Sequence, residues 1–467
     1  MSGSRFSQWL DSEIAAQVAQ IREFVTIPTF LRLLGCIYLV AFISFGVQAA
    51  GLVGSHGILP FANFLKAIRA EFGRSAWRYA PSVLWLRPTD AALSAVWIAG
   101  CVCALIAALG KWQRLAFALC LVLWLSVCSI GQDFLGFQWD ALLVETGFLA
   151  VFAAAWPIRI WLFRWLAFRL MFFSGVVKLA SHDPVWRGLT ALRYHYETQP
   201  LPNPLSWLMY QLPMLIQKFS TAFILIVELA VPFLFFMPRK LRHAGAWITI
   251  LLQVLIFLTG NYTYFNLLAI LLCMWMFIEP ERDLRFNIVD FGLAAVIGLL
   301  SLMLCLNLFA IPLPPGGSAL LHMAAPFEIV NNYGLFAVMT TERDEIIVEG
   351  SNDGTNWRAY EFRYKPGDPN RAPPIVAPHQ PRLDWQMWFA ALGTYQQNRW
   401  FVNFVIRLLE GEPAVTHLLA YNPFPAAPPR FIRARLFRYD FTHFGEKGWW
   451  KREDRGLYIP PVSLRER

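Results

Sequence analysis

Charged residues are scarce in this chain of 467 residues, where they make up 15% of the total against 57% for hydrophobic residues. Soluble globular domains carry roughly 25% charged residues, so this composition excludes an ordinary water-soluble fold. Cysteine is scarce as well, and all seven cysteines lie inside apolar runs with no metal-ligand spacing between them. We therefore expect no metal site, and we interpret the cysteines as packing residues.

Motifs of cofactor chemistry are also absent. The chain has no phosphate-binding loop, dinucleotide-binding fingerprint, nucleophile elbow or kinase motif, and we predict no cofactor. The formal net charge is +9, but the lysines and arginines are scattered between apolar runs and do not gather on one polar face. Nucleic acid is therefore not an expected partner.

Long apolar runs are what the chain has instead. A helix that crosses a bilayer needs roughly 20 apolar residues, and about nine such runs lie within residues 30–312. They cover residues 30–53, 91–109, 115–131, 134–156, 158–180, 219–238, 243–260, 262–279 and 291–312. We predict an α-helical polytopic membrane protein with about nine transmembrane helices.

The N-terminal segment, residues 1–29, carries no visible cleavable signal. The first apolar run follows a charged stretch and is long enough to span, so we expect it to remain in the mature protein. Within this segment, residues 7–25 place apolar side chains at helical spacing. That pattern predicts an amphipathic helix, cytosolic or lying on the membrane surface.

The distribution of lysine and arginine predicts the orientation of the spans. Cytosolic loops are enriched in both residues. With the N-terminus inside, the short inner loops carry Lys111, Arg114, Arg159, Arg239, Lys240, Arg242, Arg282 and Arg285. The short outer turns, around Gln132 and Tyr262, carry none. This orientation places two long loops, 54–90 and 181–218, and the C-terminal domain, 313–467, on the extracytoplasmic side.

The C-terminal domain has a different pattern from the spans. Strands are expected at 334–340, 345–349, 359–364 and 430–442, with a Ser-Asn-Asp-Gly hairpin turn at 351–354. Helical stretches are expected near 385–410. We predict a β-rich, sandwich-like extramembrane domain with helical additions.

Charged side chains at membrane depth are candidates for function, because burying them is costly. Asp140 and Glu145 lie near the outer end of the fourth span, and Glu228 lies within the sixth. Their expected partners are the basic residues of the fifth span, namely Arg164, Arg169 and Lys178. Asp140 and Glu145 lie about 140° apart on a helix, so they are expected to serve different neighbours. A structural ion-pair network and an active or ligand-binding site both remain open.

The extramembrane segments add two further groups of candidates. His195 and Glu197 of the second long loop could move protons or, with His182, ligate a metal, and the alternative is a hydrogen-bonded histidine in a packed loop. In the C-terminal domain, an Arg/Asp pair among aromatic side chains is expected to contact a client protein. The residues of that group are His379, Arg382, Asp384, Trp385 and Trp388. A folded Arg–Asp link under a buried Trp is the alternative.

The chain resembles the lipase maturation factor family over most of its length, from about residue 61 to residue 442. The resemblance is carried by WDALLVETGFLA at 139–150, YHYETQPLP at 194–202, GNY at 260–262 and PHQPRLDWQMW at 378–388. It implies a membrane protein that helps secreted lipases fold and assemble, with the C-terminal region contacting the client. The expected partners are a secreted or exported client protein, of which a lipase is one candidate, and membrane lipids. The sequence does not predict the oligomeric state.

The resemblance also bears on location. Animal members sit in the endoplasmic reticulum, whereas this chain ends without an ER-retention signal and has no cysteine in its outer domain. We expect a bacterial member in the inner membrane, with a cytosolic N-terminus and a periplasmic C-terminal domain. In a eukaryote the ER membrane would be expected instead.

A second resemblance keeps an enzymatic alternative open. The stretch FSGVVKL at 173–179, followed by Asp183 and Trp186, is similar to the membrane domain of vitamin K-dependent gamma-carboxylase. It implies an integral membrane enzyme acting on a lipid or exported substrate, with Lys178 as the base. The residues expected to assist are Asp140, Glu145, His195 and Glu197. We favour a maturation factor without enzymatic activity, with a transporter as the third alternative.

Overall fold

Among the residues that the structure describes, seven helices are long and apolar enough to cross a membrane, and the chain is a multi-pass membrane protein, as predicted. The computed structural model describes residues 25–154, 156–280 and 287–464. The seven helices are α2 (Ile27–Val53), α5 (Asp90–Ala108), α6 (Gln113–Ile130), α8 (Pro157–Ala180), α12 with η4 (Met214–Phe236), α13 (Arg239–Thr259) and α15 (Ile288–Leu308). The amphipathic helix expected over 7–25 falls outside the described residues, apart from Val25.

Two of the nine expected spans form shorter helices. The run at 134–156 contains only α7 (Gln138–Val151), and the run at 262–279 contains α14 (Phe265–Cys273) followed by the 3-10 turn η5 (Met274–Met276). A helix of 14 residues is about 21 Å long, less than the bilayer core of about 30 Å. Both helices are buried almost throughout. The prediction of about nine full-length spans is therefore corrected to seven long helices and two short inner ones.

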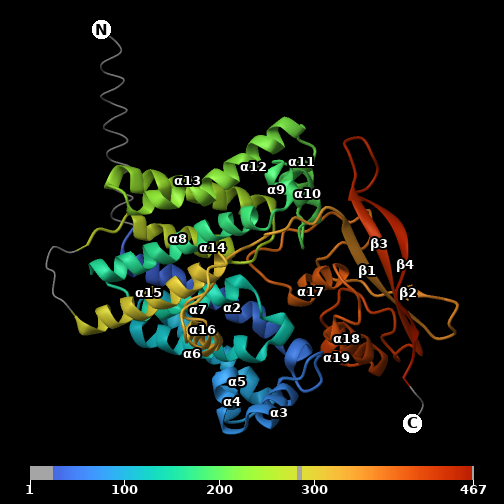
Figure 1. The fold of residues 1–467 in the computed structure, drawn as a ribbon. Helices are drawn as coiled ribbons and strands as arrows, with labels where there is room; N and C mark the ends of the chain where they lie inside the picture. Colours follow the sequence, from blue (N-terminus) through green and yellow to red (C-terminus); the bar gives the residue numbers. More distant parts are fainter. Residues whose placement is uncertain (1–24, 155, 281–286, 465–467) are drawn as a thin grey trace.

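These nine helices run alternately toward and away from one end of the bundle. At one end, Arg159 of α8 donates to Asp290 of α15 over 2.7 Å, and Arg242 of α13 donates to the Met276 carbonyl of η5 over 2.7 Å. At the other end, the backbone N–H of Ser55, just after α2, donates to the carboxylate of Asp90 at the start of α5 over 2.9 Å. Figure 1 shows the helices side by side, with the β-sheet at one end of the bundle.

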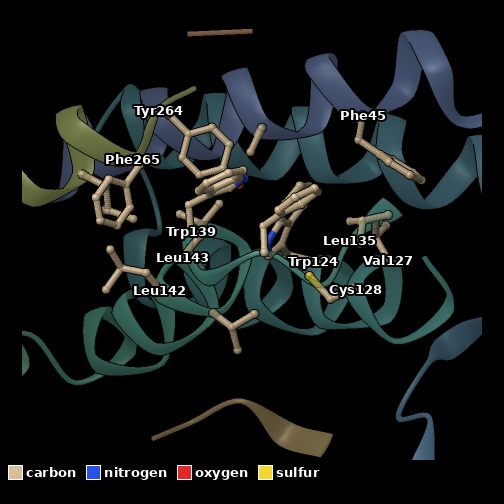
Figure 2. Packing of buried hydrophobic residues seen from close by; sticks show 14 of the residues in the cluster. Phe45, Trp124, Val127, Cys128, Leu135, Trp139, Leu142, Leu143, Tyr264 and Phe265 are labelled. Atoms are coloured by element: carbon tan, nitrogen blue, oxygen red, sulfur yellow. The ribbon is translucent and has the colours of Figure 1, made fainter. Parts of the chain in front are cut away.

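The helices pack closely because small residues line their contacts. A Cβ on Gly35 of α2 would lie 2.6 Å from the backbone nitrogen of Ala108 in α5, so a larger residue does not fit. Gly147 of α7 leaves room for the hydroxyl of Tyr38, which donates to the Leu143 carbonyl over 2.8 Å. Figure 2 shows buried side chains of α2, α6, α7 and α14 packed against one another, so the two short helices contribute to the core.

Short helices fill the connections between the spans. They are α3 (Phe61–Phe72), α4 (Ala76–Tyr79), α9 (Pro184–Arg187), α10 (Ala191–Thr198), α11 (Pro204–Tyr210) and α16 (Gly317–Ala324), with 3-10 turns η1 (Gly73–Ser75), η2 (Val83–Trp85), η3 (Gln132–Phe134) and η6 (Ala325–Phe327). The loops 54–90 and 181–218 are therefore largely structured.

The C-terminal region contains one antiparallel sheet in the order β2-β1-β3-β4. Its strands are β1 (Arg343–Ser351), β2 (Arg358–Ala359), β3 (Phe431–Phe441) and β4 (Trp450–Val462). Three helices accompany it, namely α17 (Arg382–Ala391), α18 (Arg399–Glu410) and α19 (Pro413–Thr416). The β-rich C-terminal region is confirmed, as are the hairpin turn at 351–354 and the strand expected at 430–442.

Parts of the strand prediction are wrong. Residues 334–340 form no strand, because the chain turns there and Phe336 has a left-handed φ of 54°. The segment 359–364 contributes only the end of β2. Strand β4 was not predicted, because its charged residues and paired prolines conceal an edge strand. The described residues hold a single sheet, whereas a sandwich needs two, so the sandwich-like arrangement is corrected to one sheet flanked by helices.

The sheet and its helices rest directly on one end of the bundle. A single buried hydrophobic cluster runs from the spans into α17, α18 and the sheet. The end of α2 contacts α19 so closely that a Cβ on Gly51 would lie 2.3 Å from the Ala414 carbonyl oxygen. His56 in the first long loop lies 3.1 Å from Glu412. The C-terminal region and the two long loops therefore share one end of the molecule.

Candidate functional site

Four segments that are far apart in sequence meet where the C-terminal region contacts the bundle. The indole nitrogen of Trp139 in α7 donates to the Gln380 side-chain oxygen over 2.8 Å. The indole nitrogen of Trp388 in α17 donates to the Thr198 carbonyl at the end of α10, also over 2.8 Å. The four segments are 139–150, 194–202, 260–262 and 378–388. The motifs that carry the sequence resemblance thus form one contiguous joint.

A buried ion pair lies at the centre of this joint. Arg382 donates to both carboxylate oxygens of Asp140, over 2.8 Å and 2.9 Å, and neither residue has exposed surface. The guanidinium also donates to the Phe134 carbonyl over 2.6 Å, and the Tyr264 hydroxyl donates to the carboxylate over 2.8 Å. Because each charge has a partner of opposite charge and further hydrogen bonds, the burial of both charges is compensated. The pair fastens α17 to α7.

Two other polar residues of the expected client-contact group also point inward. Nδ1 of His379 lies 2.9 Å from the Ser44 hydroxyl in α2, and burial lowers the pKa of His379 to about 4. The Asp384 carboxylate accepts the backbone N–H groups of Tyr364 and Lys365, both over 2.8 Å. Burial raises the pKa of Asp384, and these hydrogen bonds oppose that shift. His379, Arg382 and Asp384 therefore position α17 in this conformation and present little surface to a partner.

Two further ion pairs join α8 to its neighbours, and both agree with the predicted partners of Glu145 and Glu228. The fifth-span partner expected for Asp140 was wrong, because Asp140 pairs with Arg382. Arg169 pairs with Glu145 of α7, whose other oxygen accepts the Tyr333 hydroxyl over 2.7 Å. Lys178 pairs with Glu228 of α12 over 2.8 Å. Asp140 and Glu145 do serve different neighbours, as expected. Arg164, the third of the basic residues expected to pair with these acids, instead donates to the carbonyls of Trp275 and Ile278.

A cavity of about 360 Å³ surrounds the Lys178–Glu228 pair. Its walls come from helices α8 to α14, from the turn between α13 and α14, and from residues 335–336, and most lining side chains are apolar. The polar groups that line it include His195 and Tyr262, whose hydroxyl lies 2.9 Å from Nε2 of His195. We call this space the membrane cavity. Its apolar walls and few polar groups are typical of small-molecule sites.

Glu197 does not line the membrane cavity. Its carboxylate accepts the backbone N–H of Phe441 in β3 over 3.1 Å. Burial raises the pKa of Glu197 to about 7, although that hydrogen bond opposes the shift. The five residues expected to be catalytic therefore occupy four places: Lys178 and His195 line the cavity, whereas Asp140, Glu145 and Glu197 hold three separate joints. The structure does not gather them into one site.

A second, more open cavity of about 520 Å³ lies beside α17. Trp385 and Trp388 line it, so two of the five expected client-contact residues face this space. Three other lining side chains are exposed apolar groups, Val338 at 65%, Phe389 at 41% and Leu392 at 50%. We call this space the outer groove. It is separated from the membrane cavity by Leu335 and Phe336, which line both.

Uncharged polar residues that the sequence analysis did not single out complete the joint. The Gln48 side chain of α2 donates to the Gln380 carbonyl and accepts the backbone N–H of Arg382, both over 2.8 Å. The Asn261 side chain after α13 donates to the carbonyls of Leu201 and Pro374 over 3.1 Å and 2.9 Å. An amide inside or next to an apolar run is a usable signal, because its hydrogen bonds must be satisfied there.

Comparison with known proteins gives two family matches that together span most of the chain. Residues 25–282 match the lipase maturation factor transmembrane domain. Residues 329–460 match the lipase maturation factor C-terminal domain. The second match begins shortly before the sheet and includes α17, whereas the other three segments of the joint lie within the first match.

Curated relatives of the same description are similar over nearly the whole chain. Lipase maturation factor 2 of Gallus gallus is 37% identical over 93% of this chain and 81% of its own length. The Homo sapiens protein of that name is 34% identical, with 93% and 82% covered. Lipase maturation factor 1 of Bos taurus is 32% identical, with 95% and 90% covered. No solved structure matches the chain significantly.

Proposed function

This chain belongs to the lipase maturation factor family, and from that premise we propose that it assists the folding of a lipase-type client protein at the membrane. The observation that carries the proposal is the outer groove, an open, apolar space lined by two tryptophans at the joint between the bundle and the C-terminal region. Exposed apolar side chains gathered in one groove indicate a surface that a partner covers.

The groove suits a transient contact with an incompletely folded polypeptide. Folding intermediates expose apolar segments that fit an apolar groove. The exposed side chains of Val338, Phe389 and Leu392 supply the apolar contact area, whereas the two lining tryptophans are largely buried. Trp385 and Trp388 are held by α17, which the Asp140–Arg382 pair fastens to the bundle. The groove is therefore preorganised, which lowers the entropic cost of binding.

The enzymatic alternative has no support from the family membership. The Lys178 amine makes three hydrogen bonds, to both oxygens of Glu228 and to the Ser174 carbonyl, at 2.8–3.0 Å. Three is the number of donors on an ammonium group. This geometry favours an ion pair over a general base.

We further propose that the N-terminus is cytosolic and that the outer groove faces the extracytoplasmic side, the periplasm if the chain resides in a bacterial inner membrane. Arg159 and Arg242, both expected in inner loops, lie in the first turns of α8 and α13 and contact the start of α15 and the end of η5. An exported client would then meet the groove after translocation. A tag fused after Arg467 should be reachable only from outside the membrane, and cytosolic access would contradict this orientation.

The proposal is tested by placing a charge in the groove. We expect Phe389→Asp and Leu392→Asp to lower the specific activity of an exported lipase that is co-expressed with this chain, because a carboxylate in the groove repels apolar client segments. The measurements are lipase activity per amount of exported lipase, and the membrane level of each variant.

The matched control is Leu457→Asp, which places the same charge on an exposed apolar position of β4 outside the groove. Lipase activity should remain at the level of the unmodified chain with this variant. Equal losses from the groove and control variants, at equal membrane levels, would contradict a client site in the outer groove.

A further inference from the structure

The membrane cavity opens toward the bilayer. Leu255 and Leu258 of α13 and Leu205 of α11 line it and are themselves exposed. Exposed apolar side chains on a spanning helix face hydrocarbon, because water-facing positions at that depth would be polar. A molecule that enters between these side chains therefore comes from the lipid phase.

The charges inside the cavity neutralise each other. Glu228 accepts two hydrogen bonds from Lys178, and the third donor of Lys178 is used by the Ser174 carbonyl. A charged headgroup would have to leave water without gaining a free counter-charge. The cavity therefore favours an uncharged occupant.

The hydrogen bonds around His195 fix which ring nitrogen carries the proton. The Gln199 side-chain nitrogen donates to the carbonyls of Tyr196 and Thr259, so its oxygen is the acceptor of the Tyr262 hydroxyl proton. That hydroxyl has only one proton, so Nε2 of His195, 2.9 Å away, must be the donor in their contact. Burial, together with Lys178, lowers the pKa of His195 to about 4, so the ring is neutral at pH 7.

The other ring nitrogen, Nδ1, is left as an acceptor. No group of the described residues donates to it. Nδ1 is not one of the fully buried side-chain atoms that lack a partner among the described residues. It therefore retains accessible surface. Because the His195 ring lines the membrane cavity, this lone pair is available to an occupant that carries a donor. The hydroxyl of Ser220, another lining residue, has no partner among the described residues either.

We propose that the membrane cavity binds an uncharged lipid alcohol, whose hydroxyl donates to Nδ1 of His195 while its hydrocarbon chain fills the apolar space among α8, α12 and α13. A quinone or an ester offers only acceptors, which this nitrogen repels. A carboxylic or phosphate head brings a charge that the cavity does not balance. This binding site is independent of the client groove, although Leu335 and Phe336 line both spaces.

The test compares two probes that differ only in the donor. The purified full-length protein in lipid nanodiscs is labelled with a photoactivatable C16 alcohol and, separately, with its methyl ether. We expect the alcohol to label peptides of α8, α12 and α13 roughly fivefold to tenfold more than the ether, the effect of one additional hydrogen bond. His195→Phe should abolish that preference. Equal labelling by the two probes of the unmodified protein would overturn the proposal, whether or not the variant folds.

A cavity-filling variant separates the site from the surrounding lipid. Ile224→Trp places a large ring among the lining residues of α12, and Ile226→Trp places the same ring on the exposed face of that helix. Labelling by the alcohol should be lost in the first variant and retained in the second. If the alcohol labels a folded Ile224→Trp protein as strongly as the unmodified protein, the probe reaches the helices from the surrounding bilayer and not from the cavity. That result would overturn the proposal.

Discussion

At the scale of single residues, the Asp140–Arg382 pair is a buried ion pair that joins the C-terminal region to the bundle. Removing one partner of a buried ion pair leaves the other charge uncompensated, at a cost of about 3–5 kcal/mol. We expect Asp140→Asn to destabilise the protein by about that amount. The measurement is unfolding in detergent followed by Trp fluorescence, to which the buried Trp139 and Trp385 contribute.

An exposed pair supplies the control for this prediction. Arg407 and Glu410 lie three residues apart on α18, are joined over 2.8 Å, and are partly exposed. Exposed pairs contribute at most about 1 kcal/mol, so Glu410→Gln should have little effect. A similar loss in both variants would show that Asp140 has no special role in the joint.

Glu197 predicts a pH dependence of stability. Its pKa is raised from 4.5 to about 7 in the folded protein, mainly by burial, so the folded state holds a proton that the unfolded state releases. The contribution of Glu197 to the free energy of unfolding is fully present below about pH 4.5. It is lost as the pH rises to about 7, at roughly 1.4 kcal/mol per pH unit within that window.

The variant Glu197→Gln cannot release this proton. The melting temperature of the unmodified protein should therefore fall more steeply between pH 5 and pH 7 than that of the variant. Parallel curves over that range would show that Glu197 does not set this dependence.

At the scale of helices, the contact between α2 and α5 depends on Gly35. An added Cβ would lie 2.6 Å from a backbone atom of α5, which cannot move aside as a side chain can. Overpacking of this kind costs about 1–3 kcal/mol. We expect Gly35→Ala to lower the thermal stability of the bundle, measured by unfolding in detergent.

Helix α15 offers a matched control for the glycine. A Cβ on Gly292 would meet nothing within 4 Å. Alanine has the higher helix propensity, so Gly292→Ala should be neutral or stabilising by up to about 1 kcal/mol. Destabilisation by both changes would indicate a general effect of losing glycine and not a close helix contact.

The same scale shows what the sequence could predict. The lengths of the apolar runs located seven long helices. Helix geometry correctly predicted that Asp140 and Glu145 have different neighbours. The apolar runs overestimated the lengths of α7 and α14, because apolar residues beyond a helix end lengthen a run without extending the helix. Strand β4 was missed because Lys451, Arg452, Glu453 and Asp454 leave no apolar alternation. The prediction that Asp140 pairs with a basic residue of the fifth span was wrong, because its partner Arg382 lies 242 residues away and only the tertiary fold brings it near.

At the scale of the whole molecule, the C-terminal region and the bundle share one buried core. The hydrophobic cluster and the ion pair both cross the joint, and the outer groove is made from both parts. The groove therefore exists only when the C-terminal region is seated on the bundle. A C-terminal fragment expressed alone should not bind a client, and a fragment that binds as well as the full chain would contradict this.

Site-specific photo-crosslinking tests the client role of the outer groove. A photoreactive amino acid replaces Phe389 inside the groove or Leu457 on the sheet, in cells that co-express an exported lipase. We predict that the lipase is crosslinked from position 389 and not from position 457. A lipase captured equally from both positions, or only from position 457, would contradict a client site in the outer groove.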